Sequence, residues 1–228
     1  MKSDSANKEI IICKVIIESV VENLNLQVDM IQLFKKLTFE KEDQEGKRLP
    51  FTTTHIREVL LNPAKLEGLE HQAKAVLFAF AETGAGLSEL AGLLPEDIRL
   101  NDPIPHIAIT PRKHTGLKTK YRKRTIPLVG YALDAFQSCP EGFYKYRDKP
   151  DFLSSLLSKF LREHNLLPSN KHTVYSLRHS FQDRLLAVNT PDRIQAQLMG
   201  HKFPRQSYGE GGTLAHKFEW LEKIKLKE

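Results

Sequence analysis

The spacing of apolar residues along the chain predicts a protein built mainly of helices. Ile12, Ile16, Val20 and Leu24 recur every four residues, which places them on one face of an α-helix. Similar stripes, or apolar runs bounded by residues that begin or end helices, predict further helices. These are expected over residues 28–37, 51–60, 69–82, 88–94, 130–139, 151–165, 175–188, 190–199 and 214–226.

Between residues 100 and 128 the pattern changes to that of strands. Ile107 and Ile109 indicate one strand, residues 124–128 indicate a returning strand, and Gly116 lies at a turn between them. No internal repeat is present. The sequence therefore predicts a mainly α fold with one small antiparallel β-sheet, an α+β class.

The positive charge of the chain is unevenly spread. The 228 residues carry a net charge of +6; the first 50 residues hold nine acids and eight Lys or Arg, so the remainder carries +7. Seven Lys or Arg and no acid lie between Pro111 and Arg124. Like charges repel across paired strands, so a hairpin of one sign favours contact with a DNA backbone. The alternatives are a solvated face, or a basic protein without a DNA role.

Composition indicates a cytoplasmic protein without a disulfide framework. No apolar run reaches the length of about 18 residues that a membrane-spanning helix needs, and the first residues do not form a signal-peptide pattern. Cys13 and Cys139 lie far apart, which indicates a reducing compartment. The histidines do not have zinc-like spacing, so we expect neither a metal nor another cofactor.

Three residues near the C-terminal end have the chemistry needed to break a phosphodiester. Arg178 can bind a phosphate through two donors, and His201 can share a proton near neutral pH. The hydroxyl of Tyr208 can attack phosphorus and form a covalent bond. Each residue also has a structural alternative: a surface ion pair for the arginine, a helix cap or core position for the histidine, and a half-buried packing position for the tyrosine.

The same residues carry a resemblance to a known family. The stretch Tyr175-Ser-Leu-Arg178, the pair Gly200-His201 and the tyrosine Tyr208 resemble the last three boxes of tyrosine recombinases, the phage-integrase family of DNA breaking–rejoining enzymes. Upstream, the stretch from Glu82 to Leu90 resembles that family's Thr-Gly-x-Arg-x-x-Glu-Leu box. The resemblance covers roughly residues 51–220, and it implies the catalytic-domain fold of that family.

The resemblance also implies roles for individual residues. Tyr208 would be the nucleophile, Arg178 would hold the scissile phosphate, and His201 would donate to that phosphate or assist the tyrosine. Lys118 resembles the hairpin lysine that protonates the leaving 5′ oxygen, and Glu89 resembles the acid that supports the family's first arginine. The catalytic candidates are Tyr208, Arg178, His201, Lys118, Tyr175 and Glu89, with Lys120 as the alternative to Lys118. The DNA-binding candidates are Arg112, Lys113, Lys120, Arg122, Lys123, Arg124, Lys202 and Arg205.

Two positions depart from the family pattern. The first arginine of the family falls on Gly86, and the histidine of the His-x-x-Arg box falls on Tyr175. A tyrosine can still hydrogen-bond to a phosphate oxygen, whereas a glycine cannot replace a guanidinium. Losing one preorganised donor at a transition state typically costs about 100- to 1000-fold in rate. The matching boxes therefore favour enzymatic activity, whereas these two positions argue against it.

The resemblance implies a domain organisation and two functions. Residues 1–38 would be remnant helices of a core-binding domain, residues 39–50 a charged linker, and residues 51–228 the catalytic domain. The first function is a site-specific recombinase, or integrase, that cleaves and rejoins double-stranded DNA through a 3′-phosphotyrosyl intermediate. The alternative is a truncated or weakened integrase that only binds DNA or other protomers. The C-terminal helix, residues 214–226, would mediate self-association on DNA.

Overall fold

The computed structural model describes residues 3–35, 37, 48–110, 120–204 and 211–227. The chain forms two compact units, Met1–Lys47 and Arg48–Glu228. The first unit contains α1 (Ser3–Asn23) and the short α2 (Met30–Leu33). The assignment of residues 1–38 to a core-binding domain and of residues 39–50 to a linker stays a prediction.

The helix predicted over residues 28–37 is wrong in its length, because regular helix is confined to α2. The side chain of Asp29 accepts hydrogen bonds from the backbone N–H groups of Ile31 and Gln32 and so begins the helix. Phe34 leaves the helical conformation, with φ −101° and ψ 8°. A four-residue helix buries none of its residues, so the apolar stripe alone did not determine its length.

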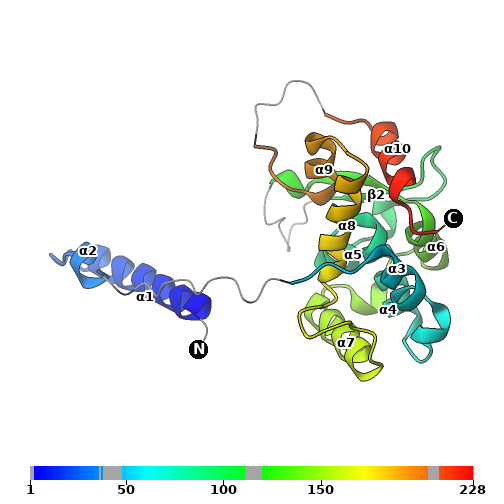
Figure 1. The fold of residues 1–228 in the computed structure, drawn as a ribbon. Helices are drawn as coiled ribbons and strands as arrows, with labels where there is room; N and C mark the ends of the chain where they lie inside the picture. Colours follow the sequence, from blue (N-terminus) through cyan, green and yellow to red (C-terminus); the bar gives the residue numbers. More distant parts are fainter. Residues whose placement is uncertain (1–2, 36, 38–47, 111–119, 205–210, 228) are drawn as a thin grey trace. The chain divides into compact units, whose positions relative to one another are not determined.

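The second unit confirms the predicted mainly helical class (Figure 1). Thr52 caps α3 with its side chain, which accepts from the backbone of His55, and a π-helical turn over Ile56–Leu60 continues it. The helices of this unit are α3 (Thr53–His55), α4 (His71–Thr83), α5 (Leu87–Ala91), α6 (Gly130–Ser138), α7 (Pro150–Glu163), α8 (Ser176–Ala187), α9 (Asp192–Met199) and α10 (Leu214–Ile224).

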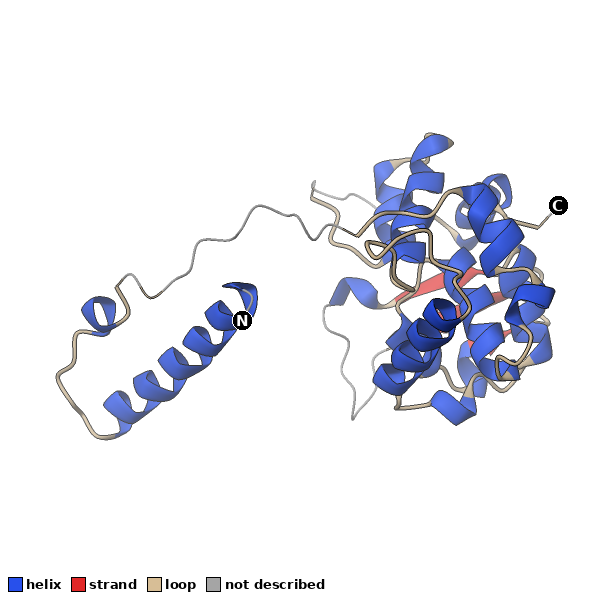
Figure 2. Cartoon of the chain, turned by 60° about the horizontal axis from the view of Figure 1, so that its bottom comes forward, coloured by secondary structure: helices blue, strands red, loops and turns tan. Residues whose placement is uncertain are grey.

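The predicted antiparallel sheet is present and has three strands in the order β1-β2-β3. β2 (His106–Ile109) pairs with β3 (Arg124–Pro127) in the register Ile107 to Ile126. The additional strand β1 (Ile98–Arg99) was not predicted, because a two-residue strand has no alternating pattern to detect. Figure 2 shows these strands enclosed by the helices of the unit.

Helix α4 lies at the centre of the hydrophobic core. Most of its residues are buried, and it packs against α6 and α8, as a helix with an apolar surface on nearly all sides must. Its buried Glu82 accepts hydrogen bonds from the backbone N–H groups of Ala132 and Leu226. Because burial opposes the charged form, the pKa of Glu82 is raised. The carboxyl group thereby joins α4 to the end of the chain.

Helix α10 packs on its own unit, where it contacts β3 and α8. Its residues Leu221 and Ile224 are buried in the common core, and the buried Arg184 of α8 donates to the carbonyl oxygen of Ile224. Leu221 and Ile224 of this helix are thus covered within the same chain. Self-association through this helix stays a prediction.

Candidate active site

Arg178 lies on α8 with its guanidinium buried between the ends of two other helices. Nη1 donates to the carbonyl oxygen of Gly84, at the end of α4, and Nη2 donates to that of Met199, at the end of α9. Burial lowers the pKa of Arg178 from its usual value. Gly84 has φ +62°, and a Cβ there would collide with the ring of Phe181, so only glycine fits this position.

His201 follows the end of α9 and contacts Arg178. Nη2 of Arg178 lies 3.2 Å from Nε2 of His201. A guanidinium has donors only, so Nε2 must accept this hydrogen bond and the imidazole must be neutral. The pKa of His201 is indeed lowered, first by burial and then by the positive charges of Arg178, Arg124 and Arg122. The structure therefore brings together two of the residues predicted to act on the phosphate.

Glu89 of α5 is the acceptor around which the remaining charged groups gather. Its Oε2 lies 2.8 Å from Nη2 of Arg124 and accepts from the backbone N–H of Gly86 at 2.7 Å; its Oε1 lies 3.1 Å from Nη1 of Arg122. Burial alone would raise the pKa of Glu89, but the hydrogen bond and charge of Arg124, the N–H of Gly86 and the charge of Arg122 together outweigh it, so the pKa is lowered. Glu89 therefore supports two arginines, where the resemblance implied one.

Arg124 is held almost entirely by protein acceptors. Besides Glu89, it donates from Nε to the carbonyl oxygen of Leu198 at 2.9 Å and from Nη1 to that of Arg122 at 2.8 Å. Its side chain is 3% exposed. These contacts tie β3 to the end of α9, directly before His201. The predicted contact of Arg124 with DNA stays a prediction, whereas Arg122, at 25% side-chain exposure, reaches solvent.

Gly86 stands where the family's first arginine would be. It caps α5 with φ −79° and ψ 153°, a conformation that every residue type can adopt. A Cβ at this position would lie 3.6 Å from Oε2 of Glu89 and 3.9 Å from Nη1 of Arg122. The backbone thus does not require glycine here, and the guanidinium of Arg122 lies beside the position.

Tyr175, which replaces the family's histidine, lies directly before α8 and is 38% exposed. Its ring packs against that of Phe80, with 5.9 Å between ring centroids, and the guanidinium carbon of Arg48 lies 5.4 Å from its centroid. This is a cation–π contact. Tyr175 therefore lies one helical turn before Arg178 with part of its side chain accessible.

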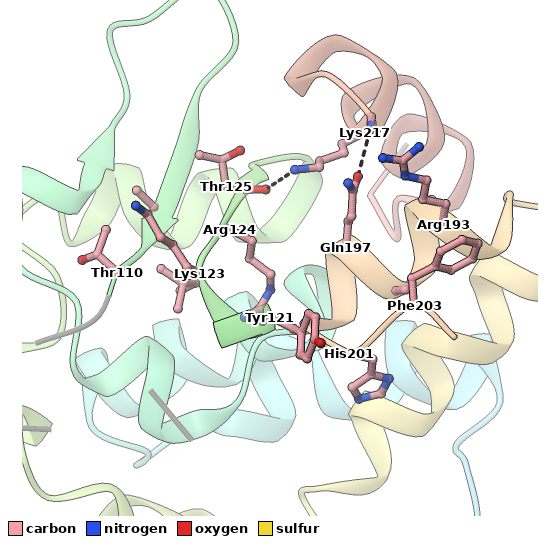
Figure 3. A pocket seen from close by; sticks show the side chains of 14 residues that line it. Thr110, Tyr121, Lys123, Arg124, Thr125, Arg193, Gln197, His201, Phe203 and Lys217 are labelled. Carbon is pink, nitrogen blue, oxygen red and sulfur yellow. Dashed lines mark hydrogen bonds between the residues drawn. The ribbon is translucent and has the colours of Figure 1, made fainter. Parts of the chain in front are cut away.

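A cleft of about 570 Å³ opens beside His201 (Figure 3). The hairpin contributes Lys123 and Arg124 to its lining, and α9 contributes Arg193. The lining also includes Lys217 of α10, which donates to the carbonyl oxygen of Thr125 at 3.2 Å. No Asp or Glu is found among the described residues that line the cleft. Arg193 and Lys217 were not among the residues predicted from the sequence; Arg193 and Gln197, four residues apart, share one face of α9, which was the available signal for Arg193.

Several predicted site residues lie outside the described residues. For Lys120 only the backbone is described, and Lys202, next to His201, is exposed. The residues whose placement is not described are Tyr208, Lys118, Arg112, Lys113 and Arg205. Their predicted roles stay predictions.

Within the described parts of the chain, no cluster of three or more His, Cys, Asp or Glu is arranged to hold a metal ion. The helices described there also include none that is long and apolar enough to cross a membrane.

The helical unit with its three-stranded sheet has the catalytic-domain fold of the tyrosine recombinases, and the resemblance seen in the sequence boxes is confirmed at the level of the fold. The Tn1549 transposon integrase, solved in complex with transposon right end DNA, superposes with a TM-score of 0.60 at 14% identity, over 96% of this chain and 75% of that chain. A lambda integrase dimer bound to a COC′ core site gives a TM-score of 0.60 at 17% identity, over 89% and 71%. The integrase from mycobacterium phage Brujita gives 0.56 at 16%, over 90% and 67%.

Searches of protein-family models and of curated proteins found no match. At identities below 20% the solved structures establish the fold, and the function has to be argued from the site itself.

Proposed function

We propose that the chain is a site-specific DNA recombinase, or integrase, that cleaves and rejoins double-stranded DNA through a tyrosine. The observation that carries this proposal is the contact of Arg178 with a neutral His201, at 3.2 Å, within a group of buried and half-buried arginines. A guanidinium can bind and neutralise a phosphoryl centre, and a neutral imidazole beside it can hydrogen-bond to the phosphate or assist the attacking group.

The reaction follows from the chemistry of these groups. The hydroxyl oxygen of Tyr208 attacks the scissile phosphorus and loses its proton, for which the neutral imidazole of His201 is the proposed acceptor. The P–O5′ bond breaks, and the 5′ oxygen receives a proton, for which Lys118 is the proposed donor. The product is a 3′-phosphotyrosyl bond and a free 5′ hydroxyl. Rejoining is the reverse attack by a 5′ hydroxyl, so the phosphodiester energy is conserved in the covalent intermediate.

Double-stranded DNA is the proposed partner because the basic residues lie on the side of the unit where the site opens. Lys123, Arg193 and Lys217 line the cleft beside His201, and positive charge of this kind provides affinity for a phosphate backbone. Action on DNA fits the cytoplasmic setting that the two separate cysteines indicate. Binding should weaken steeply as salt rises; salt-independent binding, or none, would favour a basic protein without a DNA role.

The second candidate is a module that binds DNA or other protomers without cleaving. It is favoured by Gly86, which provides no guanidinium of its own. Covalent trapping on nicked suicide DNA, prepared from candidate junction sequences of the flanking genome, separates the two functions. The recombinase predicts an adduct that Tyr208→Phe abolishes and that Tyr144→Phe, at an exposed tyrosine of the same unit, leaves unchanged. DNA binding without any adduct would support the module.

Self-association on DNA is a further part of the proposal. Because α10 packs on its own unit through Leu221 and Ile224, a contact between protomers through this helix would use its exposed residues, among them His216 and Glu219, or would require α10 to leave that position. Sedimentation with and without DNA is the test. An oligomeric state that stays the same in both conditions would contradict self-association on DNA.

A further inference from the structure

Gly86 leaves the site without the guanidinium of the family's first arginine, and three observations concern what lies in its place. The first is proximity, since Nη1 of Arg122 lies 3.9 Å from the position of a Cβ on Gly86. A side chain that began at Gly86 would therefore enter the space next to the Arg122 guanidinium. The two positions come from different elements, α5 and the segment before β3, that meet at Glu89.

The second observation is that Glu89 holds Arg122 in place. Nη1 donates to Oε1 of Glu89 at 3.1 Å, and that carboxylate is itself fixed by the N–H of Gly86 and by Arg124. The carbonyl oxygen of Arg122 accepts from Nη1 of Arg124, which fixes the backbone as well. A long side chain held at both its backbone and its charged end is preorganised, so little conformational entropy is lost when it binds a phosphate.

The third observation distinguishes Arg122 from its neighbour. Arg124 is 3% exposed and donates to three different protein acceptors, whereas the Arg122 side chain is 25% exposed and donates, among the described residues, to Glu89. A guanidinium has five N–H donors. Arg122 is also close enough for its charge to act on both Arg178 and His201. It therefore combines access to solvent with proximity to the phosphate-binding pair.

We propose that Arg122 is a catalytic residue that supplies, from the β2–β3 hairpin, the guanidinium that Gly86 lacks. Its role is to bind a non-bridging oxygen of the scissile phosphate and to neutralise the charge that develops there. In this proposal the carboxylate of Glu89 positions Arg122 of the hairpin. It does not position a side chain at residue 86, at the start of its own helix. The inference rests on the proposed recombinase function and assigns one further group to the same site.

The test compares single-turnover adduct formation by variants of the full chain on the nicked suicide DNA. Arg122→Ala should slow adduct formation by about 100- to 1000-fold, the usual cost of one preorganised transition-state donor. Arg122→Lys keeps the positive charge but not the bidentate geometry of the guanidinium, so it should slow adduct formation less than Arg122→Ala does. Arg162→Ala, which removes an exposed guanidinium from α7, is the matched control and should keep the unaltered rate. Gly86→Arg combined with Arg122→Ala should recover at least about 10-fold over Arg122→Ala alone.

A neutral scissile phosphate separates catalysis from structural support. On a methylphosphonate at the cleavage position, one non-bridging oxygen is replaced by a methyl group and the charge to be neutralised is gone. Arg122→Ala should then lose much less relative to the unaltered protein than it does on the natural phosphate. An equal loss on both substrates would mean that Arg122 only supports the structure, and the assignment would be overturned.

The remaining outcomes separate this inference from the proposed function. If the unaltered protein forms a Tyr208-dependent adduct and Arg122→Ala forms it equally fast, the function stands and the role of Arg122 is refuted. If only Gly86→Arg forms an adduct, Arg122 does not replace the missing group. If neither forms one on a site that both bind, the recombinase proposal fails and the role of Arg122 fails with it.

Discussion

Replacing Glu89 by glutamine should destabilise the second unit far more than the loss of an exposed carboxylate does. Glu89→Gln keeps the shape of the side chain and removes its charge. The buried Arg124, whose side chain is 3% exposed, then faces an amide where it had a carboxylate at 2.8 Å. The partly exposed contact of Arg122 and the hydrogen bond from the N–H of Gly86 are weakened at the same time.

The size of the effect follows from burial. Removing one partner of a buried ion pair typically costs about 3–5 kcal/mol, because the other charge stays buried without compensation. Glutamine retains an acceptor oxygen, so we expect a loss near the lower end, about 3 kcal/mol. The matched control is Glu163→Gln on α7. Its partner Lys159 lies 3.8 Å away, with side chains 59% and 71% exposed, and exposed pairs of this kind contribute about 0–1 kcal/mol.

The assay is equilibrium unfolding in urea, followed by tryptophan fluorescence. Trp220 is the only tryptophan in the sequence and lies on α10, so the signal reports on the second unit. Both variants should show the same dependence of the unfolding free energy on urea as the unaltered protein, with the midpoint lowered strongly for Glu89→Gln and barely for Glu163→Gln. Equal midpoints for the two variants would refute the reasoning from burial.

The pH dependence provides an independent check with a definite sign. Folding lowers the pKa of Glu89 below its usual value of 4.5. The contribution of Glu89 to stability is therefore complete above the pKa of the unfolded state and is lost as pH falls through the pKa of the folded state. The difference between the unaltered protein and Glu89→Gln should therefore be constant from pH 7 to about pH 5 and shrink at lower pH. A difference that grows on acidification would contradict the lowered pKa.

Two further predictions concern the segment that ends α9. Gly200→Ala should lower the free energy of unfolding, measured in urea, by at least about 1 kcal/mol more than Gly68→Ala does. Both glycines have positive φ, but a Cβ at Gly200 would lie 2.6 Å from Nη1 of Arg124, whereas a Cβ at Gly68 would meet nothing within 4 Å. Because the pKa of His201 is lowered from its usual value of 6.5, any loss of adduct formation on acidification should have its midpoint below pH 6.5. A decline already complete at pH 7 would contradict a neutral imidazole.

The elements of the fold were predictable wherever local patterns determine them. The long apolar stripes gave α4, α7, α8 and α10, and the glycines Gly84 and Gly200 gave two helix ends, because a left-handed residue closes a helix and glycine adopts that conformation without strain. The second helix of the first unit was predicted too long. None of its residues is buried, so packing did not extend the helix beyond its capped first turn.

Part of the described cluster was predictable from the sequence, and its contacts were less so. The sequence boxes identified Arg178, His201 and Glu89, which the structure brings into one cluster. They also implied that Glu89 supports a single arginine, whereas it binds both Arg122 and Arg124. These residues lie more than 30 positions from Glu89, and which of several hairpin cations is buried depends on the register of β2 and β3. No local pattern in the sequence encodes that choice.

The charge balance of the arginine cluster around Glu89 explains how the cluster is stabilised in the folded unit and still attracts an anion. Three guanidiniums, those of Arg122, Arg124 and Arg178, share one carboxylate among the described residues. The carbonyl oxygens at the ends of α4 and α9 stabilise the buried arginines, because helix C-termini carry partial negative charge. Such dipoles support a cation without cancelling its charge, so a net positive charge remains at the cluster. A phosphate of the proposed DNA partner would supply the missing negative charge, and its binding should stabilise the folded unit as well as begin the proposed reaction.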